Sequence, residues 1–220
     1  LSEKAAYVVP SAGDYYTQPR VPTDVSILRS HRERPWGPTI ARFGDVDVTS
    51  QVIEFVRKQL FTDTVLGTAP LDLPEQTLST TALWFSIPPD LVGEVARQGG
   101  DLAGGIHAVE HAAIGLLPLF AMCDRWDIGG VSYPRHPQTD GPTIFIYDGH
   151  PGGVGITEKG FALLDDLMAA TLDAIESCPC ESGCPSCIQS PKCGNLNAPL
   201  DKAAAVLLLR GLLHRPAPAP

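Results

Sequence analysis

Short apolar runs separated by proline, glycine and aspartate occupy the first 88 residues of the chain. Residues 7–9, 25–28, 39–43 and 80–87 each have the length and side-chain types of a strand. Gly44-Asp45, between the runs 40–43 and 46–48, predicts a hairpin turn. Residues 52–58 fit either a strand or a helix, because so short a run has no decisive period. Residues 1–88 are therefore predicted to be rich in β-structure.

Longer apolar patterns with helical spacing begin at Pro89. Asp90 is expected to cap a helix that ends near Gly99, and residues 105–122 predict a buried helix interrupted by Pro118. A strand at 143–147 precedes a glycine-rich turn at 148–155 and a helix at 157–176. The last helix is expected to start at Pro199 and to continue to residue 213. Residues 89–215 are thus predicted to be mainly helical, and residues 216–220 form a Pro/Ala tail.

The cysteines are concentrated in one short segment. Five of the six fall between residues 178 and 193, whereas a disulfide framework usually spreads its cysteines to join distant loops. Tight clustering favours a bound metal and a reducing, cytoplasmic setting. Cys123, in a helical apolar stretch, is expected to be an ordinary buried thiol.

The spacing of the clustered cysteines indicates tetrahedral zinc. The x2 spacing of Cys184 and Cys187 lets a tight turn direct two thiolates at one metal, and Cys178-x-Cys180 does so in extended backbone. Thiolates at all four positions leave no place for water, so the role is structural rather than catalytic. An iron–sulfur cluster, or cysteines without metal, are the competing readings. We expect four of these five to bind one structural Zn2+: Cys178, Cys180, Cys184, Cys187 and Cys193.

His107-Ala-Val-Glu-His111 matches the H-x-x-E-H pattern of inverted zinc proteases. Five residues match easily by chance, and a buried helix also uses such side chains in hydrogen-bond networks. Together with three aspartates, the motif defines an alternative function as a metal-dependent hydrolase or nuclease. The competing reading gives those aspartates turn-forming roles. The residues of this alternative are Glu110, His111, Asp124, Asp127 and Asp148.

The net charge of −9 disfavours binding of nucleic acid by the surface as a whole. One segment nevertheless concentrates basic and aromatic residues. Arginines beside an aromatic ring suit a single nucleic-acid strand, through phosphate charge and base stacking, although a solvated loop would have the same composition. The candidate DNA-binding residues are Arg29, Arg32, Arg34, Arg42 and Trp36.

Two signals are missing from the sequence. The turn Gly152-Gly-Val-Gly155 lacks the lysine of a P-loop, and no P-loop occurs elsewhere, so this chain is not itself an ATPase motor. No run of about 18 apolar residues occurs, so no membrane partner is expected.

Four strings outside the cysteine cluster carry a resemblance to a known family. They are His107-Ala-Val-Glu-His111, Asp127-Ile-Gly-Gly130, Ile146-Tyr-Asp-Gly-His-Pro-Gly-Gly-Val-Gly155 and Gly194-Asn-Leu-Asn-Ala-Pro-Leu-Asp-Lys202. With the cysteines, they resemble the C-terminal zinc-binding region of MrfA/SftH-type superfamily 2 DNA repair helicases. The resemblance implies a 3′-to-5′ helicase as the parent protein, whose motor domains would precede residue 1.

These observations together predict an α+β fold, with a β-rich accessory region at 1–88 and a helical zinc-binding domain at 89–215 closed by a four-cysteine knuckle. The expected function is a non-catalytic accessory module of a DNA repair helicase. Its expected partners are DNA, as a single strand, and the motor domains of the same parent chain. A protein-interaction domain that binds no nucleic acid is the second alternative.

Overall fold

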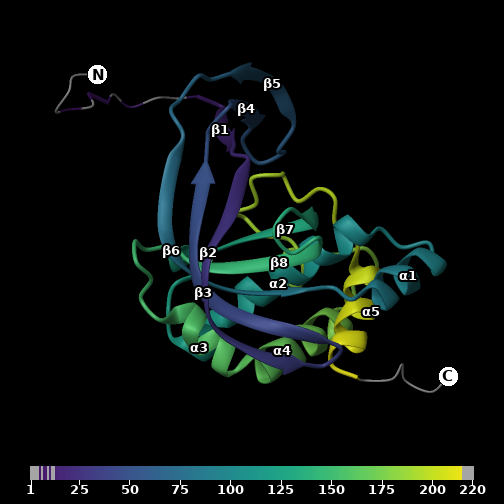
Figure 1. Ribbon diagram of the computed structural model, residues 1–220. Helices are drawn as coiled ribbons and strands as arrows, with labels where there is room; N and C mark the ends of the chain where they lie inside the picture. The colour runs from purple at the N-terminus through teal and green to yellow at the C-terminus, as the bar shows by residue number, and fades with distance from the viewer. Residues whose placement is uncertain (1–4, 6, 9, 11–12, 215–220) are drawn as a thin grey trace.

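A computed structural model describes residues 5, 7–8, 10 and 13–214, and it has the α+β architecture expected from the sequence (Figure 1). Five helices and two antiparallel sheets make up this part of the chain. The elements in order are β1 (Tyr15–Arg20), β2 (Thr23–Trp36), β3 (Thr39–Ser50), β4 (Glu54–Gln59), β5 (Val65–Pro70), β6 (Gln76–Ser86), α1 (Pro89–Arg97), α2 (Leu102–Ala121), the 3-10 turn η1 (Arg125–Asp127), β7 (Ile128–His136), β8 (Gly141–Asp148), α3 (Ile156–Ala162), α4 (Leu164–Ser177) and α5 (Lys202–Leu212).

The larger sheet has the strand order β2-β3-β6-β8-β7, and the smaller one has the order β1-β4-β5. Alternate residues of β6 face opposite sides of the larger sheet. Leu83 and Phe85 join the main core, which packs against the helices. Ala82 and Trp84 belong to a separate apolar cluster that also contains Phe145. The central strands are therefore buried on both faces.

The two edge strands of the larger sheet, β2 and β7, are joined by side chains. The Tyr133 hydroxyl accepts from Val25 N at 2.7 Å, and His136 Nε2 lies 2.9 Å from Val25 O. The Gln138 amide pairs with both the N–H and the C=O of Ile27, at 2.7 and 2.9 Å. The sheet consequently curls around the smaller apolar cluster.

Helix α2 lies at the centre of the main core. It packs against α4, α5 and β7, and its residues from Gly104 to Ile114 are buried. A Cβ on Gly105 would lie 2.8 Å from the Cβ of Ala204, so glycine permits the close approach of α5. By length and composition alone this helix could cross a membrane, but 67% of the relevant window is buried within the fold. Its apolar character is thus accounted for by its place in the core.

The hairpin turn predicted at Gly44-Asp45 is wrong, because both residues lie inside β3. A Cβ on Gly44 would lie 1.9 Å from Arg29 O, at a point where the register of β2 against β3 shifts. Glycine serves close backbone approach at this bulge. The turn itself lies at Gly37 and Pro38, between β2 and β3.

The predicted helices differ from the observed ones at their ends. Residues 157–176 form two helices, α3 and α4, separated at Leu163. Helix α5 starts at Lys202 rather than at Pro199, since the Asp201 carboxylate caps it by accepting from Ala204 N. Asp90 lies in the first turn of α1, whose N-cap is Pro88.

Strand β7 has no counterpart in the sequence-based prediction. It pairs with β8, and β8 pairs with β6, so strands from residues 1–88 and 89–215 share one sheet. The predicted division of the chain into two domains at residue 88 remains a prediction. The tail at 216–220 lies outside the described residues.

Candidate metal centre

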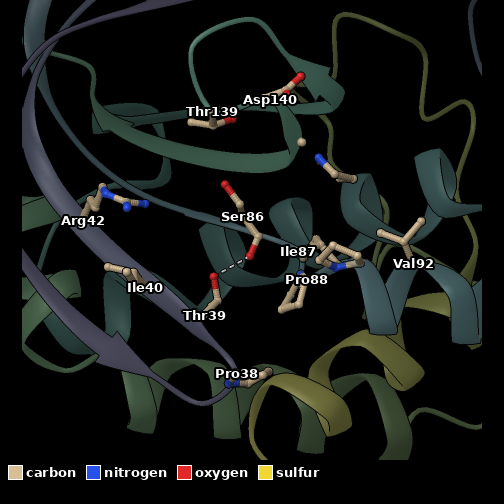
Figure 2. A pocket seen from close by; sticks show the side chains of 13 residues that line it. Pro38, Thr39, Ile40, Arg42, Ser86, Ile87, Pro88, Val92, Thr139 and Asp140 are labelled. Carbon is tan, nitrogen blue, oxygen red and sulfur yellow. Dashed lines mark hydrogen bonds between the residues drawn. The ribbon is translucent and has the colours of Figure 1, made fainter.

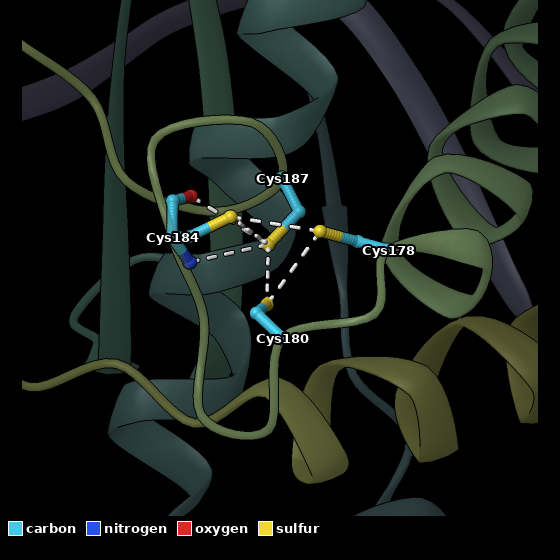
Figure 3. Close-up of side chains that lie close together, drawn as sticks. All are labelled: Cys178, Cys180, Cys184 and Cys187. Atoms are coloured by element: carbon cyan, nitrogen blue, oxygen red, sulfur yellow. Dashed lines mark hydrogen bonds between the residues drawn. The ribbon is translucent and has the colours of Figure 1, made fainter.

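Four cysteine sulfurs converge between the end of α4 and the start of α5 (Figure 3). The Sγ–Sγ distances are 3.6 Å for Cys178–Cys180, 3.5 Å for Cys178–Cys184, 3.5 Å for Cys180–Cys187 and 3.8 Å for Cys184–Cys187. Tetrahedral zinc with Zn–S bonds of about 2.3 Å separates its sulfurs by about 3.8 Å. The four side chains therefore have the spacing of a closed tetrathiolate site.

Local backbone structure places these sulfurs. Cys178 is the C-cap of α4, where the chain leaves the helix in an extended conformation. Cys184 O accepts from Cys187 N at 3.0 Å and from Ile188 N at 3.1 Å, which forms the tight turn of the x2 pair. Cys184 N in turn donates to Cys187 Sγ at 3.3 Å. Hydrogen bonds from the backbone of Ser186 and from neighbouring cysteines lower the pKa of the Cys184 thiol to about 7, whereas burial raises the pKa of the Cys187 thiol to about 12.

Two residues connect the four-cysteine knuckle (Cys178, Cys180, Cys184 and Cys187) to the rest of the protein. Lys202, at the start of α5, donates through Nζ to Cys178 O at 2.7 Å and to Cys180 O at 2.6 Å. Ile188, which follows the last cysteine of the turn, is fully buried in the main core. The knuckle is thus continuous with both α5 and the core.

Cys193, the fifth clustered cysteine, lies elsewhere. Its sulfur is grouped with His107 and His111 of α2, and the three donor atoms lie within 4.8 Å of one another. The distance from Cys193 Sγ to His107 Nε2 is 3.4 Å, and all three side chains are buried. The sequence left open which four of the five cysteines bind one metal, whereas the fold groups Cys178 with the other three and places Cys193 beside the histidines.

Both imidazoles are held by backbone carbonyls. His107 Nδ1 lies 2.8 Å from Pro199 O, and His111 Nδ1 lies 2.8 Å from Ile188 O. Burial lowers the pKa of His107 and lowers that of His111 to about 4, so both rings are neutral near pH 7. Burial also raises the pKa of the Cys193 thiol.

A cavity of about 770 Å³ borders this second group. Glu110 of α2 lines this cavity. Burial raises the pKa of its carboxyl group to about 8, although a hydrogen bond with Ser132 acts in the opposite direction. Gly130 faces this carboxylate so closely that a Cβ there would lie 2.9 Å from Glu110 Oε1. Strand β7, which the sequence did not predict, therefore forms one wall of the cavity.

The three aspartates of the hydrolase alternative have structural partners. The Asp148 carboxylate is buried and accepts from the backbone amides of Val154, Ile156 and Thr157, at 2.6 to 3.2 Å. This carboxylate occupies the amide cluster that a phosphate would use at the glycine-rich turn. Asp124 and Asp127 form a reciprocal capping box around η1. These side chains stabilise turns, and the described part of the chain does not group them with Glu110 and His111 as metal donors.

The basic residues expected to bind DNA lie along β2 and β3. Arg32 pairs with Glu158 at 2.7 Å and Arg34 pairs with Asp165 at 2.8 Å. Trp36 is only 2% exposed and donates from Nε1 to Asp165 at 3.0 Å. Its ring is therefore part of the core and cannot stack on a base in this conformation, contrary to its predicted role. Arg29 is exposed, and Arg42 pairs with Glu33 at 3.3 Å. DNA contact by the arginines stays a prediction.

A second cavity, of about 630 Å³, lies between the β2–β3 turn, the end of β6 and α1 (Figure 2). Its wall is mainly apolar, and Thr39 Oγ1 there donates to Ser86 O at 2.8 Å. It contains neither the cysteines nor the histidines described above. Its lining includes Pro38, Ile40, Ile87, Pro88 and Val92.

The geometry agrees with comparisons to known proteins. The family described as the MrfA Zn-binding domain matches residues 109–188. An uncharacterised protein of Methanocaldococcus jannaschii, MJ1572.1, is 41% identical over 111 residues, which cover 49% of this chain and 99% of that protein. The chain belongs to the MrfA Zn-binding family. The resemblance stated from the sequence is thereby confirmed.

Longer proteins that are similar to this chain are helicases. An uncharacterised ATP-dependent helicase of Bacillus subtilis, YprA, is 34% identical over 187 residues, which cover 84% of this chain and 24% of that protein. The crystal structure of the DUF1998 helicase MrfA bound to DNA matches with a TM-score of 0.61 at 28% identity. That match covers 92% of this chain and 26% of the helicase. The chain thus spans about a quarter of the length of these helicases.

Proposed function

We propose that this chain is a non-catalytic accessory module of a DNA repair helicase, structured by one Zn2+ and in contact with DNA and the motor domains. The observation that carries this proposal is the convergence of four cysteine sulfurs at the spacing of tetrahedral zinc. The chain that contains them is similar in sequence to about a quarter of the length of a helicase. Zinc in such a site has no open coordination position and supplies folding free energy rather than catalysis.

The proposed zinc would stabilise the join between α4 and α5. Cys178 and Cys180 are the first and third residues after α4, and their carbonyls accept from Lys202 at the start of α5. A bound Zn2+ would fix these carbonyls and so the direction from which α5 enters the core. Metal affinity in structural zinc sites appears directly as folding stability, so this part of the fold should depend on the metal.

DNA contact is proposed for the exposed arginines of β2, the edge strand of the larger sheet. Arg29 is exposed, and Arg32 keeps 45% of its side-chain surface accessible while pairing with Glu158. The guanidinium of Arg32 also lies 5.0 Å from the centroid of Phe43, which orients it. Because the whole chain carries a net charge of −9, any affinity must come from this local surface.

The test is salt-dependent binding of a fluorescent single-stranded oligonucleotide to the 220-residue chain. Fluorescence anisotropy should show affinity falling as salt rises, and the double substitution Arg29→Ala and Arg32→Ala should weaken binding and reduce the slope of log K against log salt. Each phosphate contact contributes about 0.7 to that slope for a single strand. Arg97→Ala is the matched control, since Arg97 lies on α1 and pairs with Glu94.

An equal response of the double variant and the control would remove the arginines of β2 from the proposed interface. Absence of DNA binding at low salt would favour a protein-interaction module instead. The pairing of Arg32 and Arg34 with carboxylates is the observation that supports this second candidate, because it reduces the positive potential of the surface.

A further inference from the structure

The group of His107, His111 and Cys193 is separate from the four-cysteine knuckle. The histidines occupy successive turns of α2, with ring centroids 4.2 Å apart, and Cys193 reaches them from the loop that precedes α5. The three donor atoms lie within 4.8 Å of one another, and each side chain is buried. Soft and borderline ligands of this kind, imidazole and thiolate, are the ones that Zn2+ prefers.

The orientation of the imidazoles fits metal binding. A backbone carbonyl only accepts hydrogen bonds, so the contacts of Nδ1 with Pro199 O and Ile188 O require the proton of each ring to lie on Nδ1. The lone pair of each ring is then on Nε2. Metal-bound histidines are held in this way, with the second ring nitrogen donating to a carbonyl or carboxylate.

The sulfur of Cys193 accepts a hydrogen bond from the backbone. Asn197 N donates to Cys193 Sγ at 3.3 Å, an interaction that stabilises a thiolate. Zn–N bonds of about 2.1 Å and Zn–S bonds of about 2.3 Å at tetrahedral angles place nitrogen and sulfur about 3.6 Å apart. The observed distance from His107 Nε2 to Cys193 Sγ is 3.4 Å.

We infer that His107, His111 and Cys193 form a second zinc site, distinct from the tetracysteine site. Three protein ligands leave one coordination position, and all three residues line the cavity of about 770 Å³. The fourth ligand is therefore water or an anionic group that enters from this cavity. An open position of this kind contrasts with the closed set of four thiolates.

The inference is independent of the proposed helicase role, and zinc content tests it. The purified 220-residue chain, dialysed against zinc-free buffer, should retain two zinc ions per molecule by mass spectrometry of the metal. Cys193→Ser should retain one, and Cys184→Ser should also retain one. Cys123→Ser, which changes a half-buried thiol outside both groups, should keep two.

A second measurement needs no variant and so does not depend on the folding of Cys193→Ser. The chain loaded with 113Cd should give two NMR resonances, because cadmium shifts respond strongly to the number of thiolate ligands. One should have the shift of a four-sulfur site, and the other the shift of a site with one sulfur and two nitrogens. A single four-sulfur resonance, one zinc per wild-type chain, copper in place of zinc, or two zinc ions in Cys193→Ser would overturn the inference.

Discussion

His111 Nδ1 lies 2.8 Å from the carbonyl oxygen of Ile188, the residue that directly follows the last cysteine of the knuckle. The side chain of Ile188 is fully buried in the main core, while its backbone orients a histidine of α2. One residue, Ile188, therefore links the knuckle to the histidine pair of α2.

Ile188→Ala tests that connection. Removal of a fully buried isoleucine side chain should cost about 2–5 kcal/mol of unfolding free energy, since it leaves a cavity in the core. Urea denaturation followed by circular dichroism measures the change. The matched control is Ile53→Ala at an exposed position, where the change should stay within about 0.5 kcal/mol. Equal effects of the two substitutions would show that the core does not anchor the knuckle.

Gly44→Ala tests the bulge between β2 and β3. The new Cβ would lie 1.9 Å from Arg29 O, so the strands must separate, at a cost of about 1–3 kcal/mol. Gly93→Ala is the control on an exposed helix position, where a Cβ meets nothing within 4 Å and alanine should stabilise by about 0.5–1 kcal/mol. Thermal melting of both variants gives the comparison. Stabilisation by Gly44→Ala would contradict the close approach.

Gly44 also illustrates how far the sequence could predict this fold. Gly-Asp between apolar runs has the composition of a hairpin turn, and only the neighbouring strand shows that the glycine serves a bulge. Strand β7 was not predicted for a related reason, because adjacent glycines such as Gly129 and Gly130 are typical of turns rather than of strands. A Cβ on Gly129 would in fact lie 2.2 Å from the ring of Tyr147 in β8.

The candidate site was predicted only in part for a physical reason. Cys184 and Cys187 lie three residues apart, so their convergence follows from local turn geometry. Cys193 and His107 are 86 residues apart, and their contact depends on how α2 packs against the loop before α5. No local spacing contains that information, which left the role of the fifth cysteine undecided.

Asp148→Asn tests the role of the buried carboxylate at the glycine-rich turn. An amide offers one oxygen instead of two, so at least one of the N–H groups of Val154, Ile156 and Thr157 loses its acceptor. The expected loss is about 1.5–3 kcal/mol, the range for a hydrogen bond to a charged group. Asp140→Asn, at an exposed residue paired with Arg135, should be nearly neutral. An unchanged stability of Asp148→Asn would show that these N–H groups do not depend on the Asp148 carboxylate.

Asp127 gives a prediction for acidic pH. The hydrogen bond from Asp124 N and then the one from His150 lower the pKa of its carboxyl group below the ordinary 3.8. A lowered folded-state pKa means that the capping contacts stabilise the turn above the ordinary pKa and are lost as pH falls through the lowered value. NMR titration of the Asp127 carboxyl carbon measures the midpoint. His150→Ala should raise that midpoint, and a wild-type midpoint at or above 3.8 would refute the assignment.

The central claim is that Cys178, Cys180, Cys184 and Cys187 hold one structural zinc ion. Anomalous X-ray diffraction at the zinc edge, from crystals of the purified chain, locates such an ion directly. A peak about 2.3 Å from all four sulfurs, with no water bound, is the predicted result. Sulfurs without a peak between them, or an ion bound by fewer than four of these sulfurs, would contradict the account.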